Sequence, residues 1–205
     1  ETTFVTTARR DARFFVEVGN GELAIQVLRK ALETYPDHTE LSLDLADVHM
    51  AQGHMQEAVV QFRHLASTFR KAGNLERASD SYRRLKVLIP DSAEVAMDLA
   101  QVYMEQERYA DAMNEYRTAL RLNLNDREAL MGLGQAASRK GSLRDAVLAF
   151  KKLLALDPRD IQAHRYLGEA FLGNGLTAEA VKEFLTAGTL LVETGDFSEA
   201  RSVYE

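Results

Sequence analysis

Small and large apolar residues recur at fixed intervals along the whole chain. Seven alanines mark the pattern, and a large apolar residue follows each of them four positions later. The alanines are Ala24, Ala58, Ala78, Ala112, Ala146, Ala180 and Ala200. The intervals between them are 34, 20, 34, 34, 34 and 20 residues. A period of this size predicts a stack of like units that bury their cores against one another, and such stacks typically bind other molecules along an extended face.

One unit, residues 127–160, shows the expected local structure. Leucine and alanine at helical spacing predict a first helix that ends at Gly141, because glycine tolerates the left-handed conformation after a helix. A second apolar stripe predicts a helix that ends before Pro158. The short loop between the two helices makes them antiparallel neighbours. Gly134 and Ala146 are small where the backbones should approach most closely, and Phe150 should fill the space beside them.

This unit resembles a tetratricopeptide repeat. The resemblance rests on residues that match the family pattern, namely Leu133-Gly134, Ala137, Gly141, Ala146, Phe150, Leu153 and Pro158. The same marks recur in phase over almost the whole chain, although no unit opens on tryptophan and Asp11 replaces the leucine of the first unit. The resemblance implies an all-α fold, a right-handed α-solenoid of antiparallel helix pairs, whose inner face commonly holds a peptide.

The two 20-residue intervals predict helices that each serve two units. Residues 57–72 and 179–194 leave no room for two further helices, and both lack the proline that stands twelve residues after Ala24, Ala78 and Ala146. Many residues of this pattern also recur with a spacing of 122 residues, which indicates an ancestral duplication. We therefore expect one solenoid over residues 1–205. Its units are about 5–38, 39–72, 59–92 (overlapping), 93–126, 127–160, 161–194 and 181–205 (overlapping and truncated).

Composition narrows the classes of function. The formal net charge is −6, which disfavours a general role in binding nucleic acid or anionic membranes. The chain contains no cysteine and no run of 18 apolar residues, so we expect a cytoplasmic location and no membrane insertion. It begins at Glu1 and ends in the middle of the pattern, so we expect a piece of a longer repeat protein.

No combination of residues in the sequence predicts catalysis or a cofactor. Phosphate loops, nucleophile motifs and zinc motifs are not found, so we expect a protein that is not an enzyme and needs no cofactor or metal. The five histidines share no spacing typical of metal ligands, and His49 and His54 lie five residues apart across a predicted turn. A structural or surface role is favoured for them.

The inner face of the first helices holds the candidate partner-binding residues. Positions 15 and 8 residues before an anchor alanine lie on one side of a helix. Apolar residues at these positions are Leu43, Met50, Met97, Met104 and Met131. Methionine suits adaptable apolar binding surfaces. The alternative is that these side chains pack against neighbouring units.

A second candidate surface is basic. Arg63, Arg70 and Lys71 lie on the first shared helix, near acidic residues such as Asp44 and Asp47, and would anchor an acidic partner segment. The alternative is a solvated surface of mixed charge. Because Asp44 and Asp47 replace the basic residues and asparagines with which chaperone-binding relatives hold carboxylates, we do not expect chaperone C-termini as partners.

The sequence therefore predicts an adaptor or scaffold that binds a protein or peptide partner in its concave face, in the manner of bacterial assembly, motility or polarity scaffolds. The alternative is a non-catalytic targeting region of a larger enzyme, such as a glycosyltransferase or kinase. The open C-terminal end also allows self-association.

Overall fold

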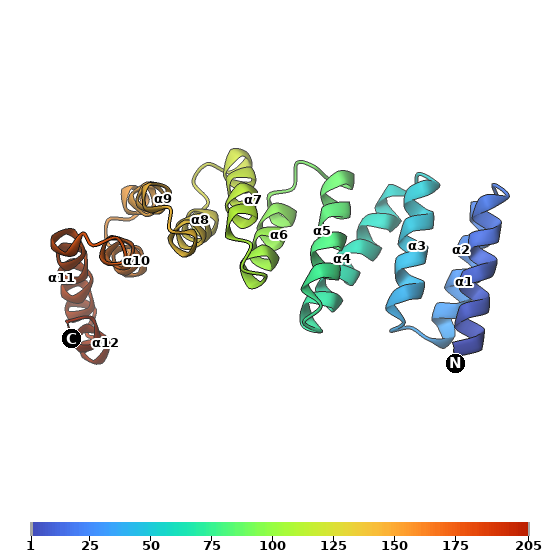
Figure 1. The fold of residues 1–205 in the computed structure, drawn as a ribbon, viewed down its shortest axis with the longest axis horizontal. Helices are drawn as coiled ribbons and strands as arrows, with labels where there is room; N and C mark the ends of the chain where they lie inside the picture. The colour runs from blue at the N-terminus through green and yellow to red at the C-terminus, as the bar shows by residue number, and fades with distance from the viewer. Residues whose placement is uncertain (1, 205) are drawn as a thin grey trace. The chain divides into compact units, whose positions relative to one another are not determined.

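The computed structural model describes residues 2–204, which form twelve α-helices and no strand (Figure 1). The chain divides into two compact units between Asp91 and Ser92, and each is described by itself. Unit 1 contains α1 (Thr2–Glu17), α2 (Gly21–Thr34), α3 (Thr39–Ala51), α4 (Met55–Lys71) and α5 (Leu75–Leu88). Unit 2 contains α6 (Ala93–Glu105), α7 (Tyr109–Leu122), α8 (Arg127–Lys140), α9 (Leu143–Leu156), α10 (Ile161–Leu172), α11 (Thr177–Thr194) and α12 (Phe197–Tyr204).

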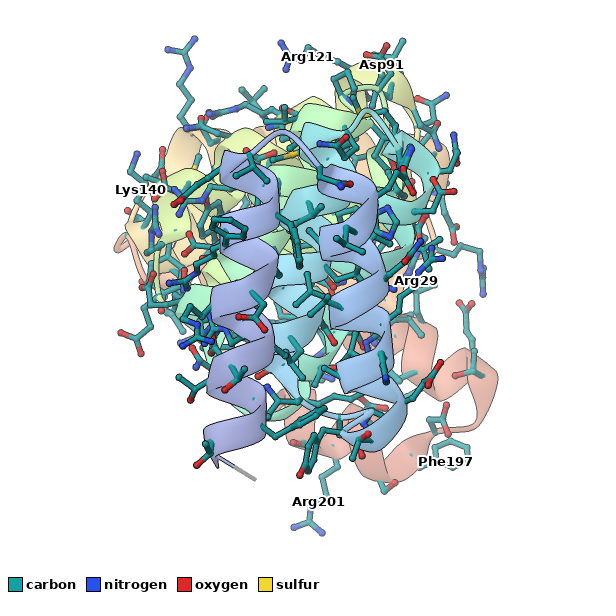
Figure 2. The ribbon with its side chains drawn as sticks, turned by 90° about the vertical axis from the view of Figure 1, so that its right-hand side faces the viewer. Arg29, Asp91, Arg121, Lys140, Phe197 and Arg201 are labelled. Atoms are coloured by element: carbon teal, nitrogen blue, oxygen red, sulfur yellow. The ribbon has the colours of Figure 1, made fainter. Side chains whose placement is uncertain are left out.

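Successive helices within each unit are antiparallel neighbours joined by short turns, as α1 and α2 illustrate in Figure 2. All seven anchor alanines are buried, with at most 3% of their surface exposed. Five of the large residues that follow them are also buried, Phe184 is half-buried, and the side chain of Tyr204 lies outside the described residues. The all-α fold and its pattern of helix pairs, an α-solenoid, are confirmed.

The contact between α8 and α9 shows why the pattern needs small residues. A Cβ atom on Gly134 would come within 2.4 Å of the Phe150 ring, so only glycine lets this ring enter. Phe150 is fully buried as a result. The prediction that Phe150 fills the space beside Gly134 is confirmed.

The turn residue five positions before each anchor alanine adopts a left-handed backbone. The six glycines at this position have φ values from +73° to +88°. Glu107, which takes the seventh place, has a φ of +58°, the one positive value among the described non-glycine residues. A side chain in this region costs conformational energy, because Cβ crowds the backbone.

Replacing Glu107 with glycine is expected to raise the free energy of unfolding by about 1 kcal/mol, because it removes this strain. Urea denaturation followed by circular dichroism measures the change. The matched control is Gly73→Glu, which places glutamate in a turn with a φ of +73° and should destabilise by a similar amount. Loss of stability in Glu107→Gly would contradict the account of the turn.

Both shared helices are continuous, as predicted. Helix α4 runs from Met55 to Lys71 and α11 from Thr177 to Thr194, so each begins two residues before the predicted start. The exposed first turns carry no buried apolar residue that could have marked these starts. In α4 the buried residues are those expected for its two roles, namely Ala58, Phe62, Leu65, Ala66 and Phe69.

The helix starts repeat with the 122-residue period. Helices α2, α3, α4 and α5 begin at residues 21, 39, 55 and 75, and α9, α10, α11 and α12 begin at residues 143, 161, 177 and 197. The two shared helices therefore occupy equivalent places in the pattern. The division of the chain into overlapping repeat units stays a prediction. The same holds for a single solenoid that continues over residues 1–205.

Candidate functional site: the first-helix faces

Polar contacts link the first helices of unit 2, which are α6, α8 and α10, to one another and to the last helix, α12. Gln101 on α6 donates to Glu128 on α8 at 3.2 Å. At the other end of the row, Arg165 on α10 pairs with Glu199 on α12 at 2.5 Å. Helix α8 also packs beside both α6 and α10. These four helices therefore form one layer within the unit.

Asp160 links α8 to α10 and is the most buried charged group of this layer. One carboxylate oxygen accepts the backbone N–H of Ala163 at 3.0 Å and so caps α10. The other lies 2.8 Å from the guanidinium of Arg127 on α8. Since the Asp160 side chain is only 3% exposed, this pair fixes where α10 begins relative to α8.

The Tyr166 ring forms part of the surface of this layer. It stacks on Phe150, with ring centroids 5.9 Å apart and an interplanar angle of 14°. Because Phe150 is itself seated against Gly134, the position of the tyrosine depends on the small residue in α8. Tyr166 is half-buried and presents a partly exposed aromatic ring.

A groove of about 500 Å³ opens beside Tyr166. Helices α6, α8, α9 and α10 and the turns that follow α8 and α10 line it. They include Met104, Gln135, Ser138, Arg139, Tyr166, Glu169 and Asn174. The groove thus combines a thioether and an aromatic ring with amides, a hydroxyl and both signs of charge. This chemistry suits a peptide, since it offers apolar contacts as well as donors and acceptors for a polypeptide backbone.

The methionines predicted for unit 2 lie at its first-helix positions. Met97, Met104 and Met131 are half-buried, and Met104 lines the groove. Gln135 and Glu169 also line the groove but were not among the predicted residues. Both occupy the position 11 residues before an anchor alanine, which lies on the same helix side as positions 15 and 8, so the helical period could have found them.

The first-helix face of unit 1 is dominated by ion pairs. Arg9 on α1 binds Asp44 on α3 through two hydrogen bonds of 2.5 and 3.2 Å. From the other side, Arg77 on α5 pairs with Glu40 at 2.5 Å, and Arg84 pairs with Asp47. The carboxylates of α3 are thereby held between the arginines of two helices. The hydrogen bond to Asp44 raises the pKa of Arg9 above its usual value.

These pairs show that α5 lies beside α3, in front of α4 in the view of Figure 1. The shared helix α4 packs against both. Since the cations of α5 are largely used in pairs, including Arg83 with Asp80, the surface of α5 is of mixed charge.

The other predicted residues of unit 1 lie on α3 and α4. Leu43 and Met50 are half-buried on α3. Arg63 and Arg70 are half-buried on α4, and Lys71 is exposed at its C-terminal end. Their role in binding a partner stays a prediction.

His49 and His54 meet across the turn between α3 and α4, with their Nδ1 atoms 3.4 Å apart. His49 is buried, and desolvation, followed by the charge of Arg29, lowers its pKa. His54 also lies 3.5 Å from Glu22 on α2. The pair therefore joins three helices and is best explained as a structural contact. Within residues 2–204, no group of three or more suitable side chains is arranged to hold a metal ion.

Comparisons with known proteins agree with this architecture. Two family models described as "Tetratricopeptide repeat" match the chain, one over residues 63–123, 97–161 and 132–187 and the other over residues 15–72. No sequence among the curated proteins matches the chain. Over residues 2–204, none of the helices combines the length and apolar character needed to cross a bilayer.

Solved structures of MamA proteins are similar in fold. One, titled "Crystal structure of MamA protein", is 23% identical, with a TM-score of 0.54, over 96% of this chain and 97% of that one. Another, "MamA MSR-1 C2", is 20% identical, with a TM-score of 0.57, over 95% of this chain and 99% of that one. At these identities the likeness concerns the fold alone.

Proposed function

Because the chain belongs to the tetratricopeptide repeat family, we propose that it is a non-catalytic scaffold that binds a protein partner on its first-helix faces. The observation that carries this proposal is the groove lined by Met104, Gln135 and Tyr166. A volume of about 500 Å³ accepts one or two side chains of a peptide, and its polar residues can bond the peptide backbone.

Within unit 2, the polar contacts between helices and the groove have different roles. Polar contacts at the helix ends, such as Arg127 with Asp160, hold the first helices in register. The groove then provides the apolar anchor point, where interfaces concentrate their binding energy. On unit 1, a contact with the partner would involve Leu43, Met50, Arg63, Arg70 and Lys71.

A binding experiment tests the role of the groove. Partners are captured with the 205-residue chain, identified, and their affinities measured for the wild type and for Met104→Glu. A charge in the groove should weaken binding by about 2 kcal/mol or more, roughly thirtyfold, while helicity is retained. The matched control is Leu148→Glu, since Leu148 is exposed on α9 and lies outside the groove lining.

Ser138→Trp provides a second variant, because Ser138 is exposed and a large ring there fills the groove without disturbing the core. A partner that binds both variants as tightly as the wild type would contradict the proposal. The identity of the captured partner also tests the narrower expectation of a bacterial assembly, motility or polarity scaffold.

A further inference from the structure

Helix α11 carries an exposed face with apolar residues along one flank. Val181, Leu185 and Val192 are 49%, 52% and 44% exposed, although the opposite side of the helix packs against α10 and α12. A shallow groove of about 650 Å³ follows this face. It is lined by Ala178, Val181, Lys182, Leu185, Thr186, Thr189, Leu190 and Glu193.

The equivalent helix of unit 1 does not share this chemistry. Shifted by 122 residues, Leu185 and Val192 correspond to Arg63 and Arg70 on α4. Lys182 and Glu193 correspond to Val60 and Lys71, so α4 has no such pair of opposite charges. The apolar residues and the charge pattern of α11 are therefore not required by the shared-helix architecture.

The face of α11 is complementary to itself when two copies run antiparallel. Residues at equal distances from the midpoint between Ala187 and Gly188 then lie opposite each other. Lys182 then faces Glu193 of the second copy, and the exposed Val181 and Leu185 border the contact. At the crossing point Thr186 faces Thr189, and these short side chains permit a close approach of the helices.

Electrostatics favour this pairing over a parallel one. In the antiparallel arrangement the Lys182–Glu193 pair forms twice, as a two-fold axis requires. Glu193 also pairs with Arg159 of its own chain at 2.6 Å, so its carboxylate would be held between two cations. A parallel arrangement would instead place Lys182 against Lys182 and Glu193 against Glu193.

We propose that the α11 face is a homodimer interface in which α11 packs antiparallel to α11 of a second copy. This interface is distinct from the groove of α6, α8 and α10, so a dimer would present two partner-binding sites. If one partner assembly offers two binding segments, both sites of the dimer can bind it. Once the first contact has formed, the second forms at a high effective concentration, so the overall affinity rises.

Sedimentation equilibrium over a range of protein concentrations tests the proposal. The wild type should dimerise, and Lys182→Glu should raise the dimer dissociation constant at least tenfold by placing two carboxylates opposite each other. The exchange Lys182→Glu/Glu193→Lys should restore much of the affinity. Lys151→Glu, an equal charge change at an exposed position on α9, should leave the dimer unchanged.

Cysteine cross-linking tests the direction of packing, because the chain has no cysteine of its own. An equal mixture of Thr186→Cys and Thr189→Cys chains should form disulfide-linked heterodimers faster than either variant forms homodimers. A wild type that is monomeric at all concentrations, or a dimer unaffected by Lys182→Glu, would overturn the proposal. Preferred homodimer cross-links would overturn the antiparallel arrangement.

Discussion

Replacing Phe150 with alanine is expected to lower the free energy of unfolding of unit 2 by about 3–5 kcal/mol. The ring is fully buried and fills the space that Gly134 leaves open. Tyr166 stacks on the other side of the ring, so the resulting cavity also removes support from the groove. Chemical denaturation followed by circular dichroism measures the loss of stability.

Leu148→Ala is the matched control for this variant, since Leu148 lies on the same helix but is 59% exposed. It should change stability by less than about 0.5 kcal/mol, as substitutions at exposed sites usually do. Equal effects of the two substitutions would show that the assigned contact between α8 and α9 is wrong.

Replacing Ser67 with proline should destabilise unit 1 by about 3 kcal/mol or more. Ser67 lies inside α4, four residues before its last residue, where proline removes an intrahelical hydrogen bond and its ring collides with the preceding turn. Because α4 packs against both α3 and α5, breaking it separates two helix contacts at once. Thermal and urea denaturation both report the effect.

Ser67→Ala serves as the control, because alanine keeps the helix and removes only the hydroxyl. Its stability should stay close to that of the wild type. A proline variant as stable as the alanine variant would indicate that residues 55–71 tolerate a break, as two separate helices would.

The regular part of the fold could be predicted because each element has its own local signal. Ala58, Phe62 and Leu65 recur at helical spacing, and the absence of proline after Ala58 marked α4 as one continuous helix. The turn glycines were predictable for a similar reason, since the left-handed conformation selects glycine. Glu107 shows the limit of this signal: the repeat geometry imposes a positive φ whatever residue stands there.

The functional surface was less predictable, because it depends on contacts between helices that are distant in sequence. Asp44 and Asp47 were expected near the basic residues of the shared helix, yet arginines of α1 and α5 bind them. No local spacing connects Arg84 to Asp47, since their pairing follows from how α3 and α5 pack around α4. Tyr166 likewise joins the groove through its stacking on Phe150, which a single-helix pattern does not reveal.

Hydrogen exchange of the chain alone and with its captured partner tests most directly whether the first-helix face of unit 2 binds protein. The account predicts that the partner slows amide exchange in α6, α8 and α10 around the groove lined by Met104, Gln135 and Tyr166. Protection confined to α7 and to the part of α9 after Ala146, with unchanged exchange in α6, α8 and α10, would contradict it.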